Sequence, residues 1–178
     1  MGGAHEQADK NFTDESPFPD VAPYNTSRDG FVPRWSGNCH CGAVRFAANA
    51  DPVSSVCCHC STCQVVHGAT SQRAVLFKKD MILFEEESLD QLAFYQTHDK
   101  KVGRHLPCKV RCKTCGTLVA DEGRNMWLAF PALFQFPDGE PESFKPTDHL
   151  FYSQRCMDLE RKEGVTFWDK AKGQSEKL

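Results

Sequence analysis

The central part of the sequence reads Cys57-Cys58-His59-Cys60-Ser61-Thr62-Cys63, and the chain contains ten cysteines in all. Two smaller cysteine groups lie on either side of this stretch, CHCG at residues 39–42 and CKTCG at residues 112–116. Cysteines at such tight spacings, outside a secreted disulfide-rich domain, are typical of metal ligands. The three groups are therefore the starting point for predicting the fold and the site.

The composition fits a single globular domain in a reducing compartment. The chain has 178 residues, of which 40% are hydrophobic, and its formal net charge is −3. It has no secretory signal pattern and no apolar run of the roughly 18 residues that a membrane helix needs. We therefore predict a cytoplasmic protein without a membrane span. Nucleic-acid binding is disfavoured, because phosphate recognition needs an excess of basic side chains.

Short runs of β-forming residues alternate with turn signals from residue 31 onward. The runs cover residues 43–46, 74–77, 81–84, 92–95, 117–120 and 126–130. Lys79-Asp80 suits a tight turn between the second and third runs. No apolar period of 3.6 residues lasts for three turns, so long helices are not expected. The pattern predicts a mainly β fold with one or two short helices.

One helix is predicted directly after the central cysteine group. Ser61 and Gln64 have the spacing of a capping box, and Gly68 can end the helix. Cys63 would then lie in the first turn. Amide dipoles at that position stabilise a thiolate and lower the pKa of the thiol.

The chain is predicted to have a single domain with two polar ends. Residues 1–30 are polar and are expected to form a flexible N-terminal arm, or a strap laid over the domain, without regular structure. The zinc-binding domain is predicted at residues 31–170, followed by a charged tail at 171–178. We find no internal repeat and no domain linker.

Two of the cysteine groups together have the ligand set of a structural zinc site. The natural pairing joins Cys39 and Cys41 with Cys112 and Cys115. In a C-x-x-C motif followed by Gly, backbone N–H groups can point at thiolate sulfur, and two distant pairs complete a tetrahedron. Metal binding would then supply folding free energy to a small β core.

The pairing leaves Cys58, Cys60 and Cys63 as three ligands on one short loop, with a fourth position open. This is the ligand count of a catalytic zinc. Three thiolates outweigh the charge of Zn²⁺, so the site suits a substrate thiolate better than the activation of water. His67 could face the open position as a proton donor or acceptor.

Spacing alone leaves other zinc assignments open. Two structural zincs could form, one from Cys60 and Cys63 with Cys112 and Cys115, and one drawing on Cys39, Cys41, Cys57 and Cys58. Cys108 could instead replace one of the partners of Cys112 and Cys115. A redox C-x-x-C is disfavoured because no βαβ pattern surrounds either pair.

The remaining reactive side chains are given structural roles. Cys57, Cys108 and Cys156 are interpreted as buried apolar cysteines. His40 and His59 lie between ligand cysteines and are expected to point away from the metal. The basic stretch at residues 100–113, which includes Lys109, is predicted to be a solvated β-edge. It could instead offset anionic zinc sites or bind a substrate carboxylate.

Three motifs follow one another in a characteristic order: GNCHCGAVRF at 37–46, CHCSTCQ at 58–64 with HGA at 67–69, and CKTCGT at 112–117. The chain resembles the family of glutathione-dependent formaldehyde-activating enzymes and centromere protein V. The similarity runs from about Trp35 to Trp168 and includes the tail around His149, Tyr152, Arg155 and Asp158. It implies a single-domain zinc-binding β-tent of small antiparallel sheets with two Zn²⁺ per chain. The implied ligands agree with the spacing: a structural zinc at Cys39, Cys41, Cys112 and Cys115, and a catalytic zinc at Cys58, Cys60 and Cys63.

The resemblance implies a carbon–sulfur lyase-type enzyme that joins formaldehyde to glutathione, its co-substrate, as S-(hydroxymethyl)glutathione. The chain departs from the commoner pattern at residues 64–67, where Val65 replaces a basic residue, and at residues 70–72, which replace an aromatic. These positions would border the pocket and decide which small-molecule thiol or carbonyl binds. The rival hypotheses are a zinc enzyme acting on another small molecule of specialised metabolism and a non-catalytic zinc-stabilised interaction module. The sequence does not indicate an oligomeric state.

Overall fold

A computed structural model describes residues 22–178. Most of the predicted N-terminal arm, residues 1–21, therefore lies outside the described residues. The described part is mainly β, as predicted, with two sheets and two short α-helices. Neither of these helices is long and apolar enough to cross a membrane.

The elements follow one another with short connections. The strands are β1 (Trp35–Asn38), β2 (Arg45–Ala48), β3 (Ser54–Cys58), β4 (Gln72–Lys78), β5 (Ile82–Phe84), β6 (Leu92–Gln96), β7 (Lys101–Val102), β8 (Cys108–Cys112), β9 (Leu118–Glu122), β10 (Met126–Ala129), β11 (Asp148–Leu150) and β12 (Thr166–Phe167). The helices are α1 (Ser61–His67) and α2 (Glu86–Leu89), with short 3₁₀ turns η1 (Lys79–Met81), η2 (Pro131–Leu133), η3 (Glu142–Phe144) and η4 (Tyr152–Gln154). The turn predicted at Lys79-Asp80 is therefore confirmed as η1.

The strands form one small sheet and one large sheet. The small sheet has the order β1-β2-β5, and the large sheet has the order β12-β11-β3-β4-β10-β9-β8-β6-β7. Within the described residues the named strands pair antiparallel, except that β11 runs parallel to both β3 and β12. The parallel pairs bring the C-terminal part of the chain against the strand that carries the central cysteines.

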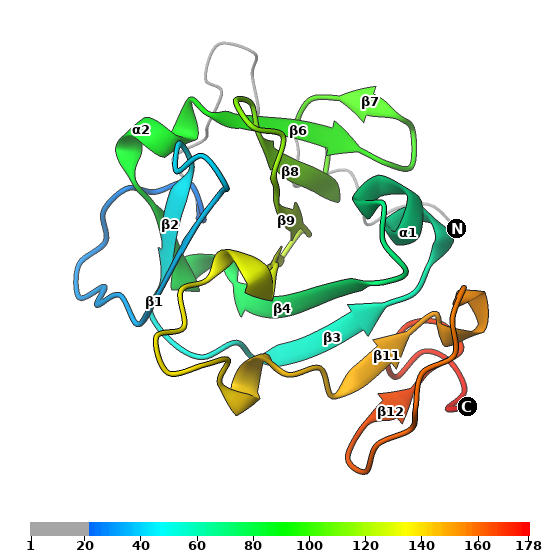
Figure 1. Cartoon of the computed structure of the whole chain (residues 1–178). Coiled ribbons are helices and arrows are strands. Elements are labelled where there is room, and N and C mark those ends of the chain that lie inside the picture. Colours follow the sequence, from blue (N-terminus) through cyan, green and yellow to red (C-terminus); the bar gives the residue numbers. More distant parts are fainter. Residues whose placement is uncertain (1–21) are drawn as a thin grey trace.

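The large sheet curves around the core (Figure 1). It runs from β12 and β11 at the lower right through β3 and β4 along the base to β8, β6 and β7 at the top, while β1 and β2 stand at the left. The core between the sheets is strongly aromatic. Trp127, Phe77 and Phe144 are 0% exposed, and Phe84 is 2% exposed. Burying this apolar area is the main favourable term that holds the two sheets together.

The strand runs expected from the sequence are all present, with ends within two residues of the predicted ones. The predicted runs did not include β1, β3, β7, β8, β11 or β12, although β7 and β8 lie in the basic stretch that was predicted to be a β-edge. Strands β3 and β8 end at Cys58 and Cys112, which were assigned as ligands, and the β-propensity of the residues before them was not used. Pairing with neighbours supplies the structure there: β3 lies between β4 and β11, and β8 lies between β6 and β9.

Helix α1 begins one residue earlier than the capping box predicts. Cys60 is the N-cap, with an extended backbone, and its Sγ accepts a hydrogen bond from the Cys63 backbone N–H at 3.4 Å. The predicted cap at Ser61 is wrong, because a thiol able to accept that bond lies one position upstream. The Gln64 amide does not reach back as in a capping box; it donates to the His59 and Gln154 carbonyls. Gly68 ends the helix at φ +57°, as predicted.

Packing starts before the predicted domain boundary at residue 31. Tyr24 is 3% exposed and packs against the rings of Phe84 and Trp127 in the core. Its hydroxyl donates to Glu122 Oε2 at 2.5 Å. Tyr24 is thus anchored in the core, which fits the alternative of a strap laid over the domain for this part of residues 1–30.

The predicted charged tail, residues 171–178, folds back on the domain. Lys172 Nζ lies 2.7 Å from Asp148 Oδ2, and the Leu178 N–H donates to the Phe167 carbonyl at 2.9 Å. Trp168 and Lys177 form an isolated antiparallel bridge. The last residues thus support β12 at the edge of the large sheet.

Candidate metal centres

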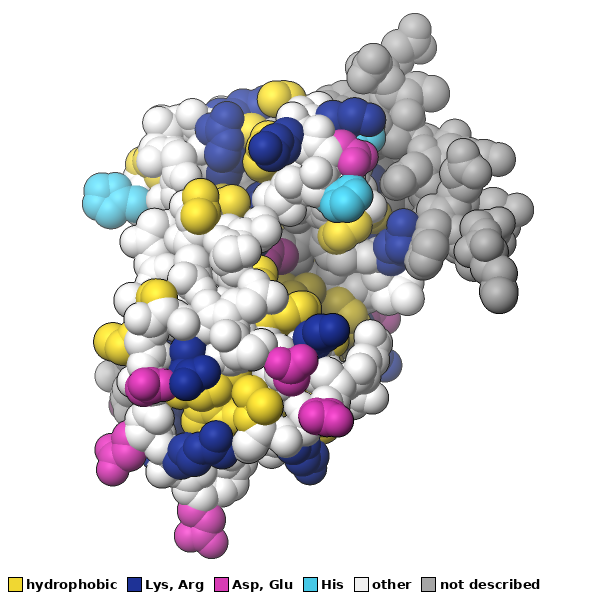
Figure 2. Space-filling view, turned by 90° about the vertical axis from the view of Figure 1, so that its right-hand side faces the viewer, with side chains coloured by type: hydrophobic (Ala, Val, Ile, Leu, Met, Phe, Trp, Pro, Cys, Tyr) yellow, Lys and Arg dark blue, Asp and Glu magenta, His cyan; other side chains and the backbone are white. Residues whose placement is uncertain are grey.

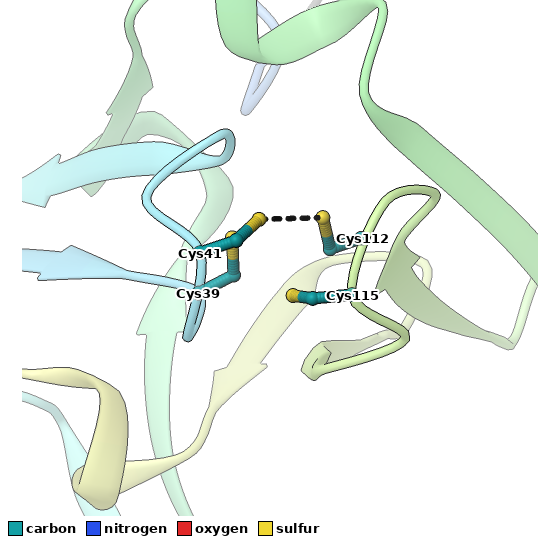
Figure 3. A group of neighbouring side chains, drawn as sticks. All are labelled: Cys39, Cys41, Cys112 and Cys115. Carbon is teal, nitrogen blue, oxygen red and sulfur yellow. Dashed lines mark hydrogen bonds between the residues drawn. The ribbon is translucent and has the colours of Figure 1, made fainter.

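Four thiols from two distant loops converge in the first centre. The Sγ atoms of Cys39, Cys41, Cys112 and Cys115 all lie within 4.8 Å of one another, and Figure 3 shows the side chains pointing toward a common point. Cys41 Sγ is 3.6 Å from Cys39 Sγ and 3.8 Å from Cys112 Sγ. A tetrahedron with Zn–S bonds of about 2.3 Å has sulfur–sulfur edges of about 3.8 Å. The four residues therefore fit zinc, in the grouping that spacing favoured.

Two similar turns build this centre. Gly42, at φ +77°, donates its N–H to the Cys39 carbonyl, and Gly116, at φ +74°, donates to the Cys112 carbonyl. Positive φ strains residues with a Cβ, so glycine suits both turns. The Val44 N–H points at Cys39 Sγ from 3.2 Å. One turn joins β1 to β2 and the other joins β8 to β9, so this centre links the two sheets.

Three thiols converge in the second centre, at the start of α1. Cys58 ends β3, Cys60 is the helix N-cap and Cys63 lies in the first turn, and their Sγ atoms lie within 4.8 Å of one another. Hydrogen bonds from the Cys58 and Cys63 thiols hold the pKa of Cys60 far below its usual range. Hydrogen bonding to Cys60 raises the pKa of Cys58, and in Cys63 the lowering by Cys58 is outweighed by Cys60 and burial, which raise its pKa. Without a metal the cluster therefore stabilises one negative charge, on Cys60, and the lowered pKa predicted for Cys63 is wrong.

Lys109 is a buried cation beside the three-thiol cluster. It is 7% exposed, and its Nζ lies 3.8 Å from Cys63 Sγ and 2.8 Å from Asp121 Oδ2. Burial opposes the charged form, but Asp121 and Cys63 together raise the pKa of Lys109 above its ordinary value. The prediction of a solvated edge is wrong for this residue, and its geometry instead fits the alternative of offsetting anionic thiolates. Arg104 is likewise buried, paired with Glu122.

Asp121 was not identified from the sequence. It lies directly opposite Lys109 in the β8–β9 register. Its Oδ1 atom is buried and has no hydrogen-bond partner among the described residues. Burial raises the pKa of Asp121, with Lys109 acting in the opposite direction. The pair adds a fixed cation and a buried acceptor to this end of the domain. The periodicity of β8 alone gave no sign of it.

His67 contacts the second centre through Lys109. Its Nε2 lies 3.2 Å from Lys109 Nζ, and its ring packs edge-on against Phe130 at 5.0 Å between centroids. Burial, followed by the charge of Lys109, lowers the pKa of His67 to about 4, so the imidazole is neutral. Because the ammonium only donates, Nε2 accepts, and the ring proton is assigned to Nδ1. A role of His67 in catalysis stays a prediction.

The other cysteines divide between interior and surface. Cys57 and Cys108 are each 4% exposed, as the sequence indicated, whereas Cys156 is exposed. The prediction for Cys156 is wrong because the segment after η4 runs over the surface. The alternative pairing of Cys60 and Cys63 with Cys112 and Cys115 does not occur in the described residues, and Cys108 lies near Glu122, not in the four-thiol group. His59 points away from the three-thiol cluster and contacts His149.

The fold and the two centres define a mainly β domain with one four-thiol and one three-thiol candidate metal site. The chain belongs to the glutathione-dependent formaldehyde-activating enzyme family, whose sequence model matches residues 34–154. This match confirms the predicted resemblance to the formaldehyde-activating enzymes. It supports an enzyme of this type at the level of the family. No curated protein matches the chain. Among solved structures, a crystal structure of a Rhodobacter sphaeroides protein from the Northeast Structural Genomics effort is similar. Its TM-score is 0.44 at 18% identity, covering 60% of this chain and 91% of that chain.

Proposed function

We propose that this protein adds a small thiol, glutathione, to formaldehyde and catalyses the reverse cleavage, as a carbon–sulfur lyase-type enzyme. The observation that carries the proposal is the cluster of Cys58, Cys60 and Cys63 with a buried ammonium group against it. Three sulfur donors leave room for a further ligand, and a soft, electron-rich site favours sulfur. Family membership supports a thiol and a carbonyl as substrates.

The proposal includes two zinc sites. Cys39, Cys41, Cys112 and Cys115 would hold a structural ion, and Cys58, Cys60 and Cys63 would hold a catalytic one. When bound at the three-thiol cluster, zinc supplies a coordination position that takes a substrate thiol as its thiolate. Four sulfur donors complete the coordination of a structural ion, whereas three leave one position for a substrate, and this difference supports the division.

The protein groups around the cluster would handle charge and protons. Lys109 offsets the negative charge of the sulfurs, and Asp121 holds its ammonium in place. In the reaction the substrate sulfur forms the new C–S bond, and the carbonyl π pair moves to oxygen. His67 or a bound water would handle the proton that this oxygen takes up. The proton that the substrate thiol loses would balance the proton that the oxygen gains, by exchange through solvent.

We propose that the rest of the thiol substrate lies in a surface cavity beside α1, whose lining does not include the three cluster cysteines. Its volume is about 310 Å³, and its lining includes Thr62, Val65, Val66, Tyr95 and Lys100. Lys100 offers a charge for a carboxylate of glutathione, whereas Val65, which is 81% exposed, favours a less polar thiol. A zinc enzyme acting on another small thiol adduct is therefore our second candidate. The cytoplasmic location stays a prediction.

The test follows adduct formation between formaldehyde and glutathione by exchange NMR, which separates catalysed from uncatalysed exchange. We expect saturable acceleration by the zinc-loaded protein, loss of this acceleration in Cys60→Ser, and normal activity in Cys156→Ser, since Cys156 is exposed and outside both clusters. Acceleration with another thiol but not with glutathione would favour the second candidate. No acceleration with any thiol by fully zinc-loaded protein would overturn the proposed reaction.

A further inference from the structure

Strand β3 presents ligand-type side chains on both of its faces. Side chains alternate along a strand, so Cys57 and His59 project on the side opposite to Cys58. The parallel strand β11 pairs His149 with Cys57, and the His59 N–H extends the ladder by donating to the Leu150 carbonyl at 2.9 Å. One thiol and two imidazoles thus meet on the face that does not carry the three-thiol cluster.

These three groups form a compact buried cluster. Cys57, His59 and His149 are 4%, 2% and 9% exposed, and their candidate ligand atoms lie within 4.8 Å of one another. His59 Nε2 and His149 Nδ1 are 2.8 Å apart, so the two nitrogens share a single hydrogen. Phe167 stacks on His149, and Tyr152 packs edge-on against His59.

We propose that Cys57, His59 and His149 form a third metal site, for a borderline divalent ion such as Zn²⁺. The ion would replace the hydrogen between the two imidazole nitrogens, and the Cys57 thiol would lose its proton to become the third ligand. Imidazole and thiolate are the donors that such ions prefer. None of these three residues belongs to the two sites of the proposed function, so this site stands independently of it.

The geometry requires only a small adjustment. Tetrahedral coordination with Zn–N bonds of 2.0–2.1 Å separates two nitrogens by about 3.3 Å, so the pair at 2.8 Å must open by about 0.5 Å. Small rotations of the two rings can supply this movement. The parallel β3–β11 ladder fixes the backbone of Cys57 and His149 on either side.

A surface cavity gives the cluster a route to solvent. Its volume is about 650 Å³, and its lining includes His149 and Phe167. Its charged lining residues are Arg73, Glu140, Glu142, Lys145, Glu160, Lys162 and Glu163. Figure 2 looks onto the side of the molecule where α1, β11 and β12 lie, and its lower half shows a hydrophobic patch among basic and acidic side chains. A cation and one water as fourth ligand can enter from this side.

The test counts metal in the full-length chain. Protein stripped by a chelator is reloaded with excess Zn²⁺ and desalted, and the zinc-to-protein ratio is measured by mass spectrometry. We expect about three zinc ions in the wild type, one fewer in Cys57→Ser and in His149→Ala, and no change in Cys156→Ser. When Cys57→Ser is combined with Cys60→Ser, we expect one ion fewer than in Cys60→Ser alone, which separates this site from the proposed catalytic one.

Cobalt substitution gives a second measurement of whether the third site is occupied. When Co²⁺ is titrated into the stripped protein, each occupied site adds its own thiolate-to-cobalt absorption. Loss of one of these contributions in Cys57→Ser, with the others unchanged, supports the third site. If Cys57→Ser and His149→Ala keep the wild-type zinc ratio and are only less stable, the three side chains serve packing alone and the proposal is overturned. A wild-type ratio of two at saturation, unchanged in Cys57→Ser, overturns it as well.

Discussion

At the scale of single residues, Lys109 contacts both the three-thiol cluster and the side chains beside it. It is buried and contacts Cys63, His67 and Asp121. We expect Lys109→Met to reduce kcat/KM for adduct formation about 100-fold, because the sulfurs lose a preorganised positive charge. Lys101→Met is the matched control, since the Lys101 side chain is 62% exposed; it should retain wild-type kinetics.

The same substitution also affects stability. Removing Lys109 leaves the Asp121 carboxylate without its cation, which we expect to cost about 3 kcal/mol. Adding Asp121→Asn should recover most of that loss in urea unfolding but should not recover kcat/KM. Recovery of both by the double variant would show that Lys109 serves the fold only.

Tyr24 makes a buried hydrogen bond to a charged residue, Glu122, outside the two metal centres. Its hydroxyl donates to Glu122, which also pairs with Arg104 and Lys79. We expect Tyr24→Phe to lower the free energy of unfolding by about 2 kcal/mol, the usual value for a hydrogen bond to a charged group. Chemical denaturation measures this value. An unchanged midpoint would mean that the hydroxyl contributes nothing to the docking of residues 22–30.

At the scale of elements, α1 holds two of the three cluster thiols between defined ends. Cys60 caps its start, and Gly68 ends it at φ +57°, with no atom within 4 Å of a Cβ placed there. The cost of Gly68→Ala is therefore conformational, about 1 kcal/mol, and the melting temperature should fall by about 2–4 °C. Gly68→Asn should lose less, because Asn tolerates the left-handed region. Equal losses in both variants would argue against this explanation.

At the scale of the whole molecule, the four-thiol centre joins the two sheets. Its cysteines come from the β1–β2 and β8–β9 turns. We expect Cys115→Ser to lose the cooperative unfolding transition, because metal binding at this centre is part of the folding free energy. Cys60→Ser should keep that transition and lose one zinc, since its cluster joins only β3 and α1. Near-ultraviolet circular dichroism combined with zinc analysis distinguishes the two variants. A stable Cys115→Ser protein that unfolds cooperatively would contradict the structural role of the four-thiol centre.

The sequence by itself determined the features that depend on neighbouring residues. Strand runs such as 74–77 and 92–95 and the end of α1 at Gly68 follow from local propensity, and ligand spacing identifies the three tight cysteine groups. These are short-range properties, so the linear pattern carries them. The cap at Cys60 was missed by one residue, because thiol acceptors lie outside the usual capping preferences.

Only the tertiary structure decided which distant side chains meet. Lys109 faces Asp121 because of the β8–β9 register, and His149 reaches Cys57 and His59 because β11 runs parallel to β3. Tyr24 enters the core although its neighbours in the sequence are polar. Register and strand order arise from the packing of the entire core. A local pattern does not contain this information, and a one-residue shift in strand pairing would turn side chains such as Lys109 and His149 to the opposite face.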